Sequence, residues 1–253
     1  MKTLQFKSIA ILVFVAFAVA CSNEKDEDNS LRLPSFEDNK ITLLYPDGKG
    51  SIAIAGGVQP YSVHCDSEIL KVYMDKDPNY FKYEVRGVGE TPIKISDASG
   101  QSLVLDALIR YNEWSVEITE HSVSVEGDDM TIAAQNELKE KVLTSIPVKV
   151  GGGYKFIFTE KKAGTLYVYK ERFGGEYSQG TFSVNYLDDM SREDWVYTLT
   201  FDGEEHNYLQ CLLLRSRSTE PLVPFSFYEE LTDEYKAEYP ELESVIAYQH
   251  FLQ

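Results

Sequence analysis

The chain has 253 residues, of which 41 are acidic and 24 are basic, and its formal net charge is −17 at pH 7. Hydrophobic residues make up 43% and charged residues 26% of the chain, a balance that excludes disorder over most of its length. The excess of acid argues against nucleic acid as a partner, because a phosphate backbone requires a basic surface. The many Tyr and Phe residues favour strands, so we expect a mainly β protein of one or two domains.

The first twenty residues have the pattern of an export signal. Two lysines precede an apolar run over residues 9–18, which is shorter than the roughly 20 apolar residues of a membrane-spanning helix. Residues 18–21 then read Ala-Val-Ala-Cys. Small residues before a cysteine resemble the lipobox of bacterial lipoproteins, and this resemblance implies that Cys21 becomes the first residue and carries lipid. That family prefers Leu where Ala18 stands, and ordinary secretion with cleavage after Ala20 is the alternative.

The segment after the cysteine is a polar tether. Removal of residues 1–20 takes away two lysines and no acids, so the formal charge of −17 becomes −19. Residues 21–35 have little to pack, and we expect them to be disordered. Their acidic start resembles the surface-export signal of Gram-negative surface lipoproteins, and Ser22 resembles the outer-membrane sorting pattern. We therefore expect an outer-membrane lipid anchor, at the cell surface or, as the alternative, on the periplasmic face.

Residues 36–110 are expected to form an antiparallel β-sandwich. Short alternating runs are separated by Gly, Pro and Asp turns at a spacing of about ten residues, which is typical of such sandwiches. The expected strands lie at 41–45, 51–55, 61–65, 69–73, 80–85, 93–95 and 103–105.

The end of this segment carries a resemblance to a known family. Residues 87–91 read Gly-Val-Gly-Glu-Thr, an alternating strand follows, and Asp97 and Gly100 mark a hairpin. The pattern resembles bacterial immunoglobulin-like repeats. This resemblance implies an immunoglobulin-like sandwich that acts as a spacer, adhesion or binding module, and it brings no catalytic residues.

Residues 111–253 contain most of the excess acid and mix helix with strand. We expect an α+β domain with an antiparallel meander and one or two helices. A helix with apolar positions from Met130 to Ile146 is capped by Asp128 or Asp129 and stopped by Pro147. The expected strands are 148–150, 154–159, 165–170, 181–187, 196–201, 208–215 and 244–252, with a short helix over 231–239.

The sequence contains no complete catalytic motif. The four histidines lack metal-ligand spacing, and His206, beside Glu204 and Glu205 at an expected hairpin tip, is interpreted as a solvated loop histidine rather than a zinc ligand or an acid–base group. The three glycines at 151–153 precede a strand, so they do not form a phosphate loop. Acidic doublets point to opposite faces of a strand and cannot act as a catalytic pair. We expect no catalytic residues, no metal and no cofactor.

Aromatic side chains are the best candidates for binding, because exposed rings can stack on sugars. Core packing uses the same residues and is the alternative interpretation. The candidate ligand-binding residues are Tyr167, Tyr169, Tyr177, Tyr186, Trp195 and Tyr197.

Three functions stay open from the sequence. The first is a membrane-anchored surface lipoprotein that acts as a non-enzymatic binding or adhesion module. The second is a glycan-binding accessory lipoprotein of a polysaccharide-uptake system, and the third is a hydrolase whose site is not visible as a motif. Besides the membrane, the expected partner is a neutral glycan or a protein. An exposed aromatic platform would favour glycan binding, two convergent carboxylates in a cleft would favour a hydrolase, and a flat acidic surface would favour the first function.

Overall fold

A computed structural model of the chain describes residues 29–186, 195–211 and 225–252. The signal segment, Cys21 and residues 22–28 of the tether lie outside these residues. The expectation of disorder is wrong for the end of the tether, because Arg32 pairs with Ala55 and Leu33 is buried against the first unit. The described residues are mainly β, with 56% strand and 9% helix, as the composition predicts. It divides into two compact units, and the division along β7 falls after Leu108. The short segments Leu43–Gly48 and Val85–Gly89 belong to the second unit.

The first unit is built from two sheets, and all seven strands expected in it are present. One sheet has the order β3-β6-β7 with β1 paired to β7, and the other has the order β2-β5-β4. Both sheets supply fully buried side chains, among them Phe81 and Ile95. The strands are β1 (Lys40–Tyr45), β2 (Lys49–Ala53), β3 (Ser62–His64), β4 (Leu70–Met74), β5 (Tyr80–Val85), β6 (Gly89–Ser96) and β7 (Ser102–Glu126).

Strand β7 is much longer than expected. It runs for 25 residues, whereas the sequence pattern predicts that it ends at residue 105 and that a domain boundary lies at 110–111. Its early residues pair with β6 and β1, and its later residues pair with β8 and β14. Residues 110–113 are polar or exposed, so they interrupt the alternation of apolar and polar residues that indicates a strand in the sequence. The alternation resumes with buried Val116 and Ile118, so one strand takes part in both units.

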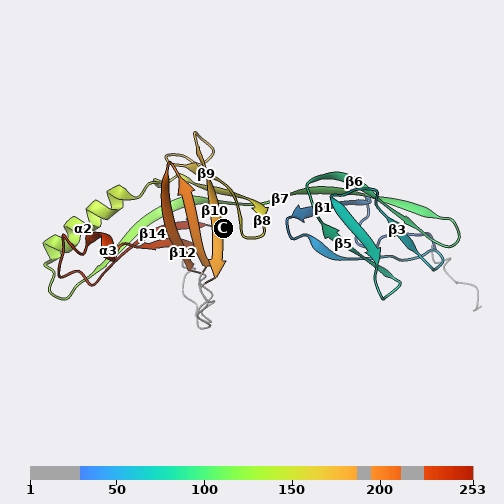
Figure 1. Cartoon of the computed structure of the whole chain (residues 1–253), viewed down its shortest axis with the longest axis horizontal. Coiled ribbons are helices and arrows are strands. Elements are labelled where there is room, and N and C mark those ends of the chain that lie inside the picture. The colour runs from blue at the N-terminus through green and yellow to red at the C-terminus, as the bar shows by residue number, and fades with distance from the viewer. Residues whose placement is uncertain (1–28, 187–194, 212–224, 253) are drawn as a thin grey trace, which may run out of the picture. The chain divides into compact units, whose positions relative to one another are not determined.

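The second unit is a closed, eight-stranded antiparallel barrel (Figure 1). Each strand from β7 to β13 pairs with the next along the chain, and β14 returns to pair with β7. Val245 lies opposite Val125, and Phe251 lies opposite Ile118, in this closing ladder. The strands after β7 are β8 (Gly153–Glu160), β9 (Ala163–Tyr169), β10 (Ser178–Tyr186), β11 (Trp195–Phe201), β12 (Glu204–Cys211), β13 (Phe225–Glu230) and β14 (Ser244–Leu252).

Closure corrects the expectation of an α+β domain. The meander is present, but its last strand pairs with its first, and helix contributes little to the unit. Residues 148–150 do not form the expected strand, and β13 was not expected. The tail over residues 244–252 is a strand, as its alternation predicts. Its partner β7 lies more than a hundred residues earlier, and no local pattern shows that pairing.

Glycine allows neighbouring strands of the barrel wall to approach closely at two places. At Gly164 and Gly180, an added Cβ would lie 2.0 Å from the backbone oxygens of Ile157 and Thr200, respectively. A glycine in a strand commonly marks such a close backbone approach. The hairpin between β11 and β12 has positive φ at Asp202 (53°) and at Gly203 (86°), the pattern of the tight turns that match strand twist.

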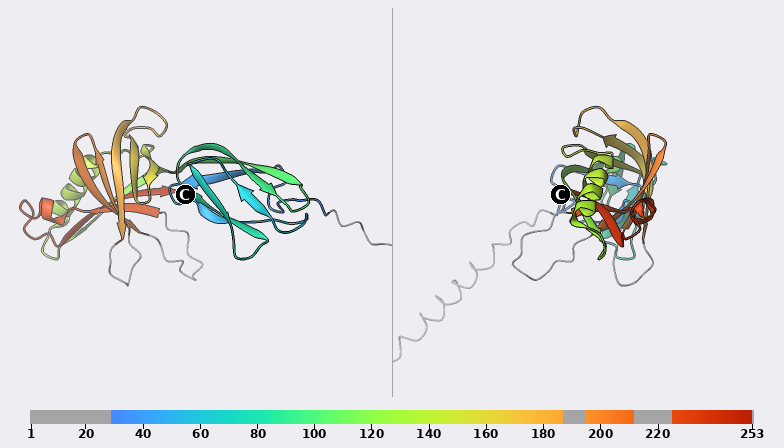
Figure 2. Two further views of the ribbon diagram at one scale, coloured as in Figure 1. Left: turned by 45° about the vertical axis from the view of Figure 1, so that its right-hand side comes forward. Right: turned by 90° about the vertical axis from the view of Figure 1, so that its left-hand side faces the viewer.

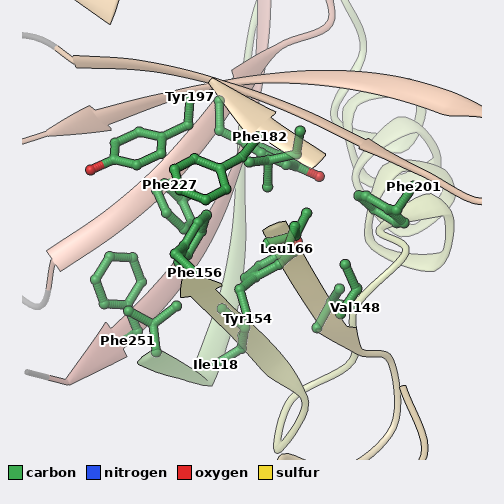
Figure 3. Packing of buried hydrophobic residues seen from close by; sticks show 14 of the residues in the cluster. Ile118, Val148, Tyr154, Phe156, Leu166, Phe182, Tyr197, Phe201, Phe227 and Phe251 are labelled. Atoms are coloured by element: carbon green, nitrogen blue, oxygen red, sulfur yellow. The ribbon is translucent and has the colours of Figure 1, made fainter. Parts of the chain in front are cut away.

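The barrel interior is filled with aromatic rings. Figure 3 shows Phe156, Phe182, Tyr197 and Phe227 gathered between the strands. Half-buried Trp114 joins them, with ring centroids between 4.9 and 5.9 Å from those of four neighbours. These neighbours are Phe156, Tyr197, Phe227 and Phe251. An eight-stranded barrel has an interior just wide enough for side chains to fill, and here bulky rings fill it.

Two helices and the adjoining ends of β7 and β14 form a second hydrophobic cluster. Helix α2 (Ile132–Ser145) lies across one end of the barrel in the right-hand view of Figure 2, and α3 (Thr232–Tyr235) is a single turn. Leu138 and Val142 are the buried side chains of α2. The N-cap of α2 is Thr131, whose hydroxyl accepts a bond from the Ala134 amide at 3.2 Å; Asp128 and Asp129, the expected caps, precede it. Within the described part of the chain, no helix is long and apolar enough to cross a membrane.

We predict that Phe156→Ala lowers the free energy of unfolding by about 3–5 kcal/mol, because it leaves a cavity among packed rings. Phe156 is fully buried, and its ring contacts Trp114, Phe182 and Tyr197. Urea unfolding followed by near-ultraviolet ellipticity measures the change. Tyr177→Ala, at an exposed position, is the control and should cost about 1 kcal/mol or less. Equal costs for the two variants would contradict this description of the core.

Candidate functional site

Two tyrosines of β9 face outward from the barrel wall. Successive side chains of a strand point to opposite faces. Leu166 and Val168 are fully buried in the interior, so Tyr167 and Tyr169 lie on the outer face. Both side chains are half-buried rather than exposed, so other residues of the chain cover part of each ring.

The covering residues come from the segment that joins β9 to β10. The Tyr177 ring centroid lies 5.0 Å from that of Tyr167 and 5.8 Å from that of Tyr169, both in edge-on arrangements. The Phe173 ring lies 4.9 Å from Tyr169. Tyr177 is 57% exposed. We call Tyr167, Tyr169, Phe173 and Tyr177 the outer aromatic cluster. In it, the open ring of Tyr177 rests on Tyr167 and Tyr169, and Phe173 packs against Tyr169.

Backbone bonds and glycines hold this segment on the wall. The Phe173 amide donates to the Gly151 carbonyl oxygen at 2.7 Å, and the Lys149 amide donates to the Lys170 carbonyl oxygen at 2.7 Å. Gly153 lies opposite Tyr169 in the ladder, and a Cβ there would come within 2.9 Å of the Phe173 ring. The run of glycines at 151–153 therefore gives Phe173 room to rest against the sheet.

A hollow of about 480 Å³ lies beside Tyr177. The lining residues of this hollow have no net charge, because the two basic residues Lys170 and Arg172 are equal in number to the two acidic residues Glu171 and Glu176. Lys170 also pairs with Asp202, with 2.5 Å between Nζ and Oδ2. The full lining is Val168, Lys170, Glu171, Arg172, Gly175, Glu176, Tyr177 and Ser178.

Two charged pairs flank the cluster. The hydrogen bonds from Lys170 and then from Ser178 lower the pKa of Asp202. Lys155 lies opposite Tyr167 in the ladder, and its Nζ is 2.8 Å from Oε2 of Glu113. The hydrogen bond to Glu113 raises the pKa of Lys155. The site thus offers ring faces, hydrogen-bond donors and acceptors in pairs, and little net charge.

The remaining sequence candidates lie elsewhere. Tyr197 is 5% exposed and belongs to the barrel core, and Trp195 packs against that core, so neither joins the outer aromatic cluster. Tyr186 ends β10, but its side chain lies outside the described part of the structure. Phe173 was missed, because it sits in a glycine-rich connection and not on a strand. The structure therefore brings together Tyr167, Tyr169 and Tyr177 of the six candidates.

The expected solvated loop position of His206 is wrong. Its side chain is only 15% exposed, and its ring stacks between Phe201 and Tyr208. His206 lies on β12, and its partner position is Leu199 in the core. Its Nδ1 is 3.8 Å from Oε1 of Glu229, which is too far for a hydrogen bond. Among the described residues, no three His, Cys, Asp or Glu side chains gather as metal ligands.

Comparisons with known proteins add little. No family model matches the chain, and no curated protein matches it. Among solved structures, domains 5–6 of the S-layer protein SbsC are similar over 69% of this chain and 86% of that chain, with 11% identity and a TM-score of 0.25. A likeness this weak indicates no function, so the function has to be inferred from the residues of the site.

We predict that Gly174→Ala lowers the free energy of unfolding by about 1 kcal/mol, because Gly174 has a φ of +75° that side chains other than glycine adopt at a cost. No atom lies within 4 Å of the added Cβ, so strain alone accounts for the loss. Gly174→Asn is the matched variant and should cost less, since Asn tolerates this conformation. Urea unfolding of the two variants tests the prediction, and an Ala variant as stable as wild type would contradict it.

Proposed function

We propose that the protein is a non-enzymatic binding module for neutral carbohydrate, and that the outer aromatic cluster is its binding surface. The observation that carries this proposal is the exposed Tyr177 ring held on Tyr167 and Tyr169. Sugar rings have apolar faces that stack on aromatic rings, while their hydroxyl groups need polar partners at the edge. The cluster supplies both kinds of contact.

Charge supports a neutral ligand. The chain carries a formal charge of −17, which repels anions. The charges that line the hollow beside Tyr177 balance, and its Lys170 is already paired with Asp202. A strongly anionic ligand would have to displace these internal pairs. An uncharged polyhydroxyl chain can bind beside them without moving a charge out of water.

The setting of this module is also a proposal. Acylation of Cys21, a tether over the residues that directly follow it, and a position at the surface of the outer membrane would hold the barrel where extracellular glycans are met. The first unit would then be an immunoglobulin-like sandwich that serves as a spacer. Its seven strands in two sheets support this interpretation. So does the expected Asp97 turn, in which the carboxylate accepts bonds from the amides of Val58, Ser99 and Gln101.

We predict that Tyr177→Ala weakens binding to a retained neutral polysaccharide by about tenfold, because it removes the one open ring of the cluster. Affinity electrophoresis against gels that contain starch, xylan, galactomannan or mixed-linkage β-glucan measures the retention. Tyr80→Ala is the matched control, because Tyr80 is a 40% exposed tyrosine on β5 in the first unit; it should bind like wild type.

Product analysis in the same experiment separates binding from hydrolysis. We expect the polysaccharide to be recovered uncut. Shortened products that disappear in Glu171→Gln or Glu176→Gln, the two acids of the hollow, would establish a hydrolase instead. Retention on none of the four gels, or equal loss in the Tyr177 and Tyr80 variants, would also contradict the proposal.

We predict that Cys21→Ala releases the protein from the membrane fraction into the soluble fraction, because two or three acyl chains bury enough CH₂ groups for stable anchoring. Fractionation of cells and incorporation of labelled palmitate measure the effect. Ser22→Ala is the control and should still take up label. A wild-type chain that incorporates no palmitate would show that the anchor is absent.

A further inference from the structure

We propose that the barrel wall carries a second subsite next to the outer aromatic cluster, and that the ligand is therefore an extended neutral polysaccharide chain rather than a single sugar or a chain end. The second subsite is a groove over β8 to β12, and its threonines come from β8, β9, β10 and β11. This inference rests on the proposed carbohydrate binding and adds the form of the ligand to it.

The groove is built around a row of three threonines. Thr165 on β9 lies opposite Thr181 on β10, and Thr181 lies opposite Thr200 on β11. Side chains that lie directly opposite in an antiparallel pair have Cβ atoms about 5 Å apart. Their neighbours Leu166, Phe182 and Leu199 are buried in the core, so the row faces outward. Three hydroxyl groups thus line up across three strands on one surface.

The surface around this row is hollowed and polar. The groove has a volume of about 510 Å³. Each hydroxyl can donate and accept a hydrogen bond, as the hydroxyl groups of a sugar also do. The lining residues are Thr159, Glu160, Ala163, Gly164, Thr165, Thr181, Phe182, Ser183, Thr198, Thr200 and Glu205.

The charge of the groove determines which kind of glycan it can bind. Two of the described lining residues, Glu160 and Glu205, are acidic, and none is basic. Sulfate or uronate groups would meet these carboxylates without a compensating cation, which is unfavourable. The carboxylates can accept hydrogen bonds from sugar hydroxyl groups instead. The groove therefore favours an uncharged polyhydroxyl chain.

The groove and the outer aromatic cluster share one face of the wall. Thr165 and Tyr167 are successive outward positions on β9, about 7 Å apart along the strand. On β10, Gln179 is the outward position between Tyr177 and Thr181, and it lies opposite Tyr167. Gln179 and Thr181 are both exposed. A chain that stacks on the rings can therefore continue over Gln179 into the groove without leaving the surface.

The two subsites predict a dependence of affinity on chain length. Ring stacking supplies binding for a short oligosaccharide, and each hydroxyl contact in the groove adds a modest gain. Affinity should rise as the chain lengthens, until both subsites are filled, and then stay level. The rise in affinity with chain length should come from the groove alone. Mutation of the groove should therefore remove the rise and leave the binding by ring stacking in place.

The test is titration calorimetry of the full chain with an oligosaccharide series, from disaccharide upward, prepared from the polysaccharide that the gels retain. Wild type should bind the longest oligosaccharides at least about tenfold more tightly than the disaccharide. The Thr165→Val/Thr181→Val double variant keeps the β-branched shape that suits a strand. It should bind every length as weakly as wild type binds the short ones. The Thr165→Ser/Thr181→Ser variant keeps both hydroxyls and should retain the rise.

The outcomes distinguish this inference from the proposed function. Tyr177-dependent retention without any rise in affinity with length would overturn the second subsite and leave carbohydrate binding in place. A rise that persists in the Val variant would also overturn it, because the gain would then come from elsewhere. Loss of binding in both the Val and the Ser variants would show that these positions act through folding and not through their hydroxyls. Retention on no gel would instead remove the proposed function itself.

Discussion

Aromatic packing inside the barrel decides which residues the outer wall can present. Phe156 is fully buried, with the rings of Trp114, Phe182 and Tyr197 around it. Each such ring pair contributes about 0.5–1.5 kcal/mol beyond the area that it buries. A shift of one residue in β9 would turn Leu166 and Val168, which pack against these rings, outward and expose them to water. The core therefore holds the register of β9, and that register places Tyr167 and Tyr169 outside.

The outer aromatic cluster then depends on short-range features around this fixed strand. Gly151 and Gly153 allow the β9–β10 segment to lie flat against the wall, where Phe173 and Tyr177 reach the two tyrosines. The charged side chains nearby are largely paired with one another, as in Lys170 with Asp202 and Lys155 with Glu113. Such a nearly neutral surface with an open ring can bind an uncharged ligand without moving a charge out of water.

Much of the fold follows from strand alternation in the sequence, and so does part of the site. In β11, Thr198 and Thr200 alternate with Tyr197 and Leu199, and this pattern already indicates that Tyr197 points inward. In β9, Tyr167 and Tyr169 alternate with Leu166 and Val168. Both faces of this part of the strand carry aromatic or apolar side chains, so the sequence leaves the facing of Tyr167 open until the core is known. Barrel closure through β7 and β14 is a long-range pairing and has no local signal. The burial of His206 follows instead from the β11–β12 ladder, in which it lies opposite Leu199.

The central claim is that ligand binds on the outer wall over β9 and β10, and an NMR titration tests it most directly. Addition of the retained oligosaccharide should shift the amide signals of Tyr167, Tyr177, Gln179 and Thr181, and leave those of the first unit in place. The signals of core residues such as Phe227 should change little. Shifts confined to the first unit, or strong shifts in the barrel core without change at Tyr177, would contradict the account.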